Sequence, residues 1–371
     1  MNILYFFKDY DSNMSKWQYV HIIDELERHG HKITVYNPLA YKSPEEANEN
    51  LIPYIKSSKI KFDIFLNCES DGFLYASTVD EICKTGLATV LICFDNLHAP
   101  HLHKKMASHF DLVWLTSYET KWLFEKWGCK KIIFQTYAAN PFNFSPHWKN
   151  PVHSVCFIGS PYGSRIPILN ALTQSEINCD VYTNSLIYKE KAANKNKIPN
   201  VKISPVEEIR RALSFDIGRK VLYAALLNRT VLKNKSTLNK NKFLSVHPSV
   251  SFDAMQEIYS NNALSLNITA LRFTYLLKNP LHKIHLRTFE IPMCGGLEIS
   301  PYTDELAGYF EDRKEIVLYK SEEEFISKSR FYLDPKNDAL ILQMKENARK
   351  RAENEHTWMN RFNKVFEILK K

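Results

Sequence analysis

The sequence predicts an α/β protein built from two doubly wound, Rossmann-like domains with a cleft between them. Apolar strand-like runs alternate with segments of helical period in both halves of the chain. A stretch with three prolines and weak periodicity, residues 140–151, separates the halves. The length of 371 residues also exceeds what one core comfortably fills. With 44% apolar and 24% charged residues, wholesale disorder and fibrous folds are excluded.

The first half begins as a β-α-β unit. Residues 2–7 form a short apolar run, residues 17–29 have helical spacing up to Gly30, and residues 33–36 are the next strand. Further strands and helices of this half are expected at 62–67, 75–84, 89–95, 112–116, 118–127 and 132–136. Alternation of this kind is typical of a parallel sheet covered on both faces.

The second half repeats the pattern with a strand at 152–158, a turn at 159–164 and a helix at 165–172. Its later elements are expected at 180–182, 252–259, 263–268, 297–300, 316–319, 321–333 and 338–370. We expect domains at 1–145 and 151–355, and a last helix at 356–371 that packs back on the first domain. Ligands of such sheets bind at the carboxyl ends of the strands.

The net charge of +8 is concentrated in one stretch. Residues 185–242 hold 14 Lys and Arg against four Asp and Glu, a net +10, so the remainder is −2. A basic amphipathic insertion fits an anionic membrane surface or an anionic polysaccharide. The alternative is a solvated loop or an oligomer contact. Nucleic acid is not expected as a partner, because few aromatic residues are interleaved among the charges.

The cysteines and the apolar runs indicate the compartment. Seven cysteines are scattered without a C-x-x-C pair, which predicts reduced, buried thiols. We expect no secretory leader and no membrane-spanning helix, because no apolar run is long enough. The expected location is the cytoplasm, with the inner face of the membrane as an option through the basic insertion.

A turn from Gly159 to Gly163 follows a strand and opens a helix. Such turns direct backbone N–H groups toward an anion, typically a phosphate. Arg165 at the start of this helix opposes the helix dipole, so an anionic ligand would explain it. The alternative is a tight connection with an exposed arginine.

A second candidate segment runs from Arg287 to Gly296. Glu290 lies among apolar residues, so a buried carboxylate there needs a partner, and it can hold both hydroxyls of a ribose. The alternative is an ion pair with Arg287, one helical turn earlier. Gly295 and Gly296 allow a close backbone approach to a ligand or simply a turn.

Four motifs together carry a resemblance. They are R-x-F-E-x-x-x-C-G-G at 287–296, F-x-G-S at 157–160, L-N-I at 266–268 and E-H-T-x-x-x-R at 355–361. The chain resembles the donor domain of GT-B glycosyltransferases, specifically the CgeB-like branch, over about 152–182 and 244–365. The resemblance implies transfer of a sugar from a nucleotide-diphosphate sugar to a glycan or lipid-linked acceptor in surface polysaccharide synthesis. It implies no metal and no cofactor beyond the donor. The alternative is a non-catalytic glycan- or nucleotide-binding protein on a degenerate GT-B fold.

The resemblance also implies roles for individual residues. Glu290 would hold the donor ribose, and Gly295 and Gly296 would let the backbone approach the nucleotide sugar. Arg165 would bind the donor pyrophosphate and stabilise the leaving group, with Arg287 as a second cation. The donor site would be completed by Gly159, Ser160 and Asn267.

Two positions depart from the family pattern. Glu290 and Glu298 have the spacing of the E-x7-E pair of retaining enzymes, but Glu298 falls after the glycines in the next strand. If Glu290 is the second glutamate of that pair, His282 occupies the first position. Ser160 replaces the arginine that the superfamily keeps after the first glycine. The retaining stereochemistry therefore stays an expectation, and both departures favour the non-catalytic alternative.

The first domain offers fewer candidates for chemistry on the acceptor. Asp95, His98 and His101 follow the strand at 89–95, where a base could deprotonate an acceptor hydroxyl. Asp95 and His98 are therefore candidate catalytic residues with Arg165. Alternatively, Asp95 caps a helix and the histidines lie on the surface. The histidine spacing does not predict a metal site, and residues 9–11 read as a solvated turn.

Overall fold

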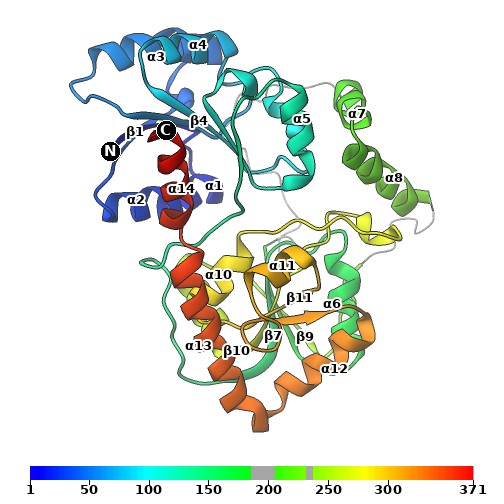
Figure 1. Ribbon diagram of the computed structural model, residues 1–371. Coiled ribbons are helices and arrows are strands. Elements are labelled where there is room, and N and C mark those ends of the chain that lie inside the picture. The colour runs from blue at the N-terminus through cyan, green and yellow to red at the C-terminus, as the bar shows by residue number, and fades with distance from the viewer. Residues whose placement is uncertain (185–204, 231–236, 371) are drawn as a thin grey trace. The chain divides into compact units, whose positions relative to one another are not determined.

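The computed structural model describes residues 1–184, 205–230 and 237–370. The chain divides into two compact units. Unit 1 comprises Met1–Asn140, Asn194–Gly218 and Trp358–Lys371, and unit 2 comprises Pro141–Ala193 and Arg219–Thr357. Each unit contains one six-stranded sheet with helices against it (Figure 1). All strand pairs in both sheets are parallel.

The sheet of unit 1 has the order β2-β1-β3-β4-β5-β6. In register, Ile3 of β1 pairs with Ile33 of β2 and Ile64 of β3. Its central strands are buried apolar runs, as expected for a parallel sheet covered on both faces. The strands are β1 (Asn2–Phe6), β2 (Lys32–Tyr36), β3 (Ile64–Asn67), β4 (Ala88–Cys93), β5 (Leu112–Leu115) and β6 (Ile132–Phe134).

The helices of unit 1 include one that the sequence analysis missed, α3 (Pro44–Ser57). Its signal was a capping box: Ser43 Oγ accepts from the backbone N–H of Glu46, and the Glu46 carboxylate accepts from the N–H of Lys42. The others are α1 (Asn13–Trp17) and α2 (Asp24–Arg28), joined by a π-helical segment at Gln18–Ile23, then α4 (Ala76–Lys84), α5 (Lys121–Lys126), α7 (Pro205–Leu213) and α14 (Trp358–Lys370).

The sheet of unit 2 has the order β12-β11-β10-β7-β8-β9. The edge strand β9 was not expected from the sequence, because its residues are half-buried or exposed and show no apolar pattern. The strands are β7 (Val152–Ile158), β8 (Cys179–Tyr182), β9 (Leu244–His247), β10 (Asn262–Leu266), β11 (Glu298–Pro301) and β12 (Val317–Tyr319).

Unit 2 contains α6 (Arg165–Gln174), α9 (Phe252–Asn261), α10 (Arg287–Met293), α11 (Asp304–Tyr309), α12 (Glu322–Leu333) and α13 (Asp338–Glu355). In the predicted basic insertion, the described residues form α7 and a second helix, α8 (Asp216–Thr230). The rest of the predicted insertion at 185–204 and 231–236 lies outside the described residues. Within the described parts of the chain, no helix is both long enough and apolar enough to cross a bilayer.

The segment expected to be helical over 338–370 forms two helices that break at His356 and Thr357, and the last helix, expected at 356–371, is α14. The second part, α14, belongs to unit 1. There the carboxylate of Glu25 accepts the backbone N–H groups of Trp358 at 3.1 Å and Met359 at 2.7 Å. A negative charge at a helix N-terminus satisfies free N–H groups and opposes the helix dipole. This local cap gives α14 its own start.

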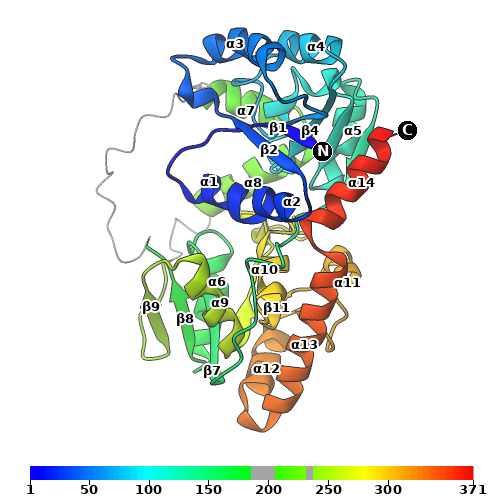
Figure 2. The same ribbon diagram turned by 90° about the vertical axis from the view of Figure 1, so that its left-hand side faces the viewer.

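The unit 2 sheet, drawn with its helices in Figure 2, has one face with apolar side chains and one with polar side chains. One face carries the apolar core, including Val155, Phe157 and Leu264, and is covered by α6 and α12. On the other face, polar side chains meet across the strands: the single proton of the Ser154 hydroxyl has acceptors in both the Asp180 carboxylate and Asn262 Oδ1. Buried polar groups are tolerated only when they are paired, so this layer fixes strand register as well as packing.

We predict that Gly295→Ala lowers the free energy of unfolding by about 2–4 kcal/mol, from the left-handed backbone and the overpacking together. Gly295 has φ 73°, and an added Cβ would lie 2.7 Å from Cβ of Pro146 and 2.8 Å from Nε1 of Trp148. Urea denaturation would measure the change.

The matched control is Gly308→Ala in α11. An added Cβ there meets no atom within 4 Å, so this variant should be as stable as the original or up to about 1 kcal/mol more stable. Equal stability of the two variants would contradict the prediction.

Candidate functional site

The carboxyl end of β7 leads into α6 through a turn that depends on glycine. Gly159 has φ 150°, and an added Cβ would lie 2.9 Å from Nη2 of Arg287. Gly163 has φ 57°, and its Cβ would lie 2.5 Å from the carbonyl oxygen of Arg272. The turn therefore packs closely against α10 and against the loop that follows β10.

Two guanidinium groups meet at this turn. Arg165, the first residue of α6, donates from Nη1 to the carbonyl of Ser160 at 2.8 Å and lies over the ring of Tyr162 at 4.5 Å. Burial, together with the nearby charge of Arg287, lowers the pKa of Arg165 to about 10. Arg287 reaches the same place from α10, because its guanidinium lies against Gly159.

Like charges brought together in a partly buried place repel each other, and an anion between them would relieve the repulsion. Planar guanidinium groups hold phosphate oxygens through paired hydrogen bonds. The start of α6 adds the partial positive charge of a helix N-terminus. Of the residues expected from the sequence, Gly159, Ser160, Arg165 and Arg287 are therefore brought together, in an arrangement suited to a phosphate-bearing ligand.

Glu290 lies one turn after Arg287 in α10 and is only 5% exposed. Beside them is a residue that the sequence analysis missed, Tyr259 of α9. Its buried hydroxyl has no hydrogen-bond partner in the part of the chain that is described. The hydroxyl lies in the fields of Arg287 and Glu290, and burial raises its pKa well above the usual value. A buried hydroxyl without a partner is costly, so a ligand group that bonds to it would be favoured.

Asn267 directly follows β10, and its side chain contacts the first turn of α10. Its amide Nδ2 donates to Thr288 Oγ1 and to Glu298 Oε1, both at 2.9 Å. Thr288 is next to Arg287 in the chain. Because both donated bonds are internal and Asn267 is 2% exposed, this side chain holds the first turn of α10 in place. Its predicted contact with the donor stays a prediction.

Glu298 begins β11 and is 2% exposed. Its Oε2 and the nearby Ser300 Oγ make no hydrogen bond of good geometry within the described residues. Burial raises the pKa of Glu298 to about 7, opposed by contacts with Asn267 and Ser300. A proton on Oε2 would supply the missing donor to Ser300. As expected from the sequence, Glu298 lies in the strand after the glycine pair.

Gly295 and Gly296 have packing partners that explain both glycines. Trp148 Nε1 donates to the carbonyl of Gly295 at 2.7 Å, and the indole occupies the place of a Cβ. At Gly296, a Cβ would lie 2.9 Å from the carbonyl oxygen of Tyr259. Both glycines are buried. Their predicted approach to a nucleotide sugar stays a prediction.

His282 lies in the loop after β10, bonded through Nδ1 to the hydroxyl of Thr269 at 2.8 Å. Burial lowers the pKa of His282, so the ring is neutral at pH 7. The hydroxyl of Thr269, fully buried, has this ring as its hydrogen-bond partner in the described structure. The position that the resemblance assigns to a carboxylate thus carries a neutral imidazole.

In unit 1, Asp95 and His98 lie in the turn that follows β4. Asp95 is exposed and His98 is half-buried. Asn96 between them is buried, and its amide donates to the carbonyl of Ser117 and to Thr120 Oγ1. These bonds fix the turn against the loop after β5. The structure thus places Asp95 and His98 at the carboxyl edge of the sheet, and their catalytic roles stay predictions.

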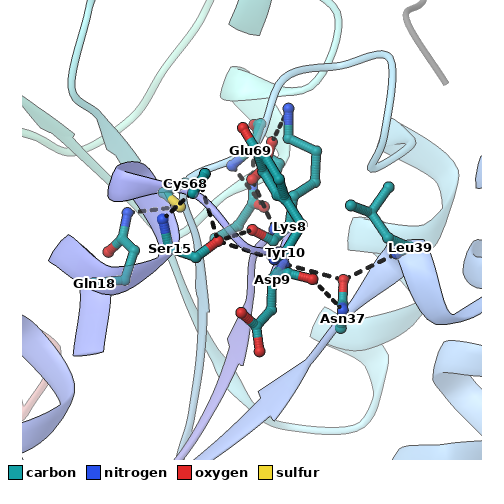
Figure 3. A network of polar contacts seen from close by, with 11 residues as sticks. Lys8, Asp9, Tyr10, Ser15, Gln18, Asn37, Leu39, Cys68 and Glu69 are labelled. Carbon is teal, nitrogen blue, oxygen red and sulfur yellow. Dashed lines mark hydrogen bonds and ion pairs between the residues drawn. The ribbon is translucent and has the colours of Figure 1, made fainter. Parts of the chain in front are cut away.

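The carboxyl ends of β1, β2 and β3 are joined by a polar network (Figure 3). The Glu69 carboxylate accepts from the backbone N–H of Lys8 at 2.9 Å and pairs with its ammonium at 3.1 Å. Asn37 accepts from the N–H of Asp9 and donates to the Asp9 carbonyl, while Ser15 Oγ donates to the Lys8 carbonyl. The loop after β1 is therefore held by side-chain bonds at three points.

The carboxylates and histidines of the described residues do not form a group of three or more able to hold a metal ion. In the 9–11 turn, which was expected to be solvated, Asp9 accepts from the hydroxyl of Tyr19 at 2.7 Å, whereas Asp11 is exposed. Asp9 thus has a structural partner on the helix that follows.

The family comparison finds a match in the second half of the chain. A family described as glycosyl transferase-like matches residues 234–367, which include α10 and its Arg287 and Glu290. No curated protein matches the sequence.

Solved structures resemble the whole chain. An alpha-glucosyltransferase in complex with UDP-glucose and DNA containing an abasic site has a TM-score of 0.60 at 12% identity, covering 100% of this chain and 99% of its own. HepE from Anabaena in complex with UDP-glucose has a TM-score of 0.57 at 11% identity, with coverage of 100% and 99%. Sucrose-phosphate synthase from Thermosynechococcus elongatus has 0.53 at 11%, with coverage of 99% and 98%.

These likenesses establish the fold, two parallel six-stranded α/β units of the GT-B glycosyltransferase type, and confirm the predicted fold class. Assignment to the CgeB-like branch stays a prediction. One of the similar structures contains DNA, so the expectation that this chain has no nucleic-acid partner also stays a prediction.

We predict that Glu298→Gln removes a pH-dependent loss of stability. The raised pKa means that the stabilising contribution of Glu298 is fully present below about pH 4.5 and is lost as the pH rises toward 7. The loss is about 3 kcal/mol by pH 8. Glutamine keeps the bond from Asn267 and gives Ser300 a donor, so the variant should lack this loss.

Urea denaturation at pH 5 and pH 8 would measure the difference between the two proteins. Glu346→Gln on the exposed face of α13 is the control and should follow the original protein. Parallel pH profiles for Glu298→Gln and the original protein would contradict the prediction.

Proposed function

We propose that this protein is a glycosyltransferase that moves a sugar from a nucleotide-diphosphate sugar to a glycan or lipid-linked acceptor. The observation that carries the proposal is the meeting of Arg165 and Arg287 at the Gly159 turn. Two cations at the carboxyl end of β7, beside a helix N-terminus, suit the two phosphates of such a donor.

The arrangement of α10 supports binding of the donor ribose next to its diphosphate. Glu290 lies one turn from Arg287, so a ribose attached to the bound diphosphate would come within reach of its carboxylate. The hydroxyl of Tyr259, for which the described residues provide no hydrogen-bond partner, lies in the field of both residues and would give the ligand a further hydrogen bond. Because the similar structures with a nucleotide hold UDP or UDP-glucose, a uridine nucleotide is the first donor to test.

The chemistry follows from charge. When the glycosidic bond breaks, negative charge develops on the departing nucleoside diphosphate, and fixed cations stabilise that charge in the transition state. Arg165 and Arg287 would supply this stabilisation, so we propose metal-independent transfer. We also propose, from the family resemblance, that the anomeric configuration is retained. Gly159, Ser160, Gly295, Gly296 and Asn267 would shape the donor side.

On the acceptor side, we propose that Asp95 and His98 orient or deprotonate the hydroxyl that receives the sugar. Their place at the carboxyl edge of the unit 1 sheet supports this role. The wider process would be surface polysaccharide synthesis. NMR analysis of the product, with glycans and lipid-linked sugars as acceptors, would show which acceptor receives the sugar and whether the anomeric configuration is retained.

A second candidate function is a binding protein that holds a nucleotide sugar or glycan without transfer. His282 favours it, because a neutral imidazole replaces the sugar-facing carboxylate that the resemblance predicts. Donor binding without transfer or hydrolysis, across a panel of acceptors, would support this alternative.

We predict that Arg165→Ala and Arg287→Ala each weaken nucleoside diphosphate binding by about 10-fold to 100-fold, the loss of one charge-assisted contact. Binding of the matching nucleoside, which has no phosphate, should change little. Isothermal titration calorimetry with UDP and uridine would measure both. Arg313→Ala, at an exposed arginine of the same unit, is the control, and equal losses for nucleoside and diphosphate would contradict the prediction.

We predict that Glu290→Ala abolishes measurable donor binding while the fold is kept, and that Glu290→Gln weakens it by about 10-fold or more, because the carboxylate accepts both ribose hydroxyls. A 2′,3′-dideoxy nucleotide should bind the original protein weakly and bind the Gln variant equally weakly. Isothermal titration calorimetry of the original protein and the Gln variant with each of the two nucleotides would measure these affinities. If the Gln variant still distinguished the two nucleotides as strongly as the original protein does, Glu290 would not hold the ribose.

A further inference from the structure

Unit 2 contains a cavity at the amino end of its sheet, with a volume of about 260 Å³. Its apolar wall consists of Trp148, Pro151, Ala263, Ala339, Ile341 and Leu342. Pro151 directly precedes β7, and Ala263 lies at the start of β10. The cavity is therefore at the sheet edge opposite to the Gly159 turn, and it is separate from the candidate donor site, which lies at the carboxyl ends of the strands.

The size and walls of the cavity suit a small organic molecule with a ring. An apolar cavity of about 150 Å³ holds one benzene ring, so about 260 Å³ has room for a ring with a short polar arm. The indole of Trp148 is fixed by its bond from Nε1 to the carbonyl of Gly295 at 2.7 Å. It therefore offers a rigid aromatic wall against which a ring can pack.

A buried cation belongs to the same cavity. Lys345 of α13 lines the cavity and is 5% exposed. Its Nζ donates to the carbonyls of Ser260 at 2.7 Å and Asn262 at 2.8 Å, at the carboxyl end of α9. Capping of that helix end explains two of the three N–H bonds of an ammonium group. Among the described residues there is no third acceptor for Lys345.

The charge of this ammonium group also lacks a bonded carboxylate within the described parts of the chain. Asp338 lines the cavity, but its carboxylate is paired with Nε2 of His153 at 2.9 Å. Burial lowers the pKa of Lys345 to about 8, and the charge of Asp338 is among the smaller effects that oppose this. Lys149, an exposed lining residue, adds a second positive charge. A carboxylate in the cavity would supply both a counter-charge and a third hydrogen-bond acceptor.

We propose that this cavity is a binding site for a small aromatic carboxylate. The ring packs against Trp148 and the aliphatic wall, and the carboxylate accepts a hydrogen bond from Nζ of Lys345. A neutral aromatic molecule would fill the apolar part but leave the ammonium group without a counter-charge. A small ion without an apolar body would leave the wall uncovered. The ligand is therefore distinct from the nucleotide sugar proposed for the opposite edge of the sheet.

The first experiment compares phenylacetate with phenylacetamide, which has the same ring but a neutral amide in place of the carboxylate. Ligand-observed NMR titration of the full chain would measure both affinities, because it detects weak binding of small molecules. Phenylacetate should bind at least about tenfold more tightly, which is the contribution of one charge-assisted contact. Acetate, which lacks the ring, should show no measurable binding.

Variants would locate the site. Leu342→Trp places a larger side chain in the cavity wall and should weaken phenylacetate binding by about tenfold or more, because the ring loses its space. The matched control is Leu340→Trp in the same helix, at a residue that does not line the cavity, and it should bind as the original protein does. The two leucines are 41% and 42% exposed, so the melting temperatures of both variants should stay close to that of the original protein.

Lys345→Met keeps the aliphatic stem and removes the ammonium group. It should lower the affinity for phenylacetate to that for phenylacetamide, with little effect on phenylacetamide itself. The variant leaves two buried carbonyls without their donor, which destabilises the fold. The comparison of acid with amide and the Leu342→Trp variant test the proposal independently of that loss.

Three outcomes would overturn the proposal. One is an absence of phenylacetate binding up to its solubility limit. Another is equal affinity for the acid and the amide, and the third is unchanged phenylacetate binding by Leu342→Trp. No nucleotide or acceptor is present in these titrations, so failure of the proposed transferase function would leave their result unchanged.

Discussion

Parallel pairing of every strand is the constraint on which both units depend. Parallel strands must be joined by crossovers, so helices cover the sheet faces and all carboxyl ends open on one edge. In unit 2 this rule brings the turn after β7 beside the loop after β10. In unit 1 it brings the loops after β1, β2 and β3 into one polar network. The turn with Gly159 and Ser160 in unit 2, and the turn with Asp95 and His98 in unit 1, come from this edge.

Buried polar contacts help to hold the candidate site of unit 2. Asn267 bonds to Thr288 and Glu298, and so ties the end of β10 to α10 and β11. The same helix carries Arg287 against Gly159 and Glu290 beside Tyr259. Because low dielectric strengthens electrostatic interactions, the meeting of two like charges at Arg165 and Arg287 is costly, and an anionic ligand is the explanation that we propose.

Glycine illustrates how one residue type serves different purposes. The resemblance assigned Gly295 and Gly296 to ligand approach, whereas the structure gives them packing partners in Trp148 and the backbone of Tyr259. Gly159, which the sequence assigned either to an anion-binding turn or to a tight connection, is the glycine that a guanidinium approaches. A sequence records that a Cβ is absent, but only the surrounding atoms decide what occupies its place.

The sequence by itself determined the two α/β halves, because apolar period and turn residues are local signals. The sequence also indicated Arg165, Arg287 and Glu290 as candidate site residues. It missed α3 and β9, whose apolar patterns are weak, and the cap that starts α14, because that cap comes from Glu25 far away in the chain. Only the tertiary structure decided that the two arginines meet, that Tyr259 lies beside Arg287 and Glu290, and that the Glu298 carboxyl is buried against Asn267. These are contacts between residues distant in sequence, and no local pattern specifies them.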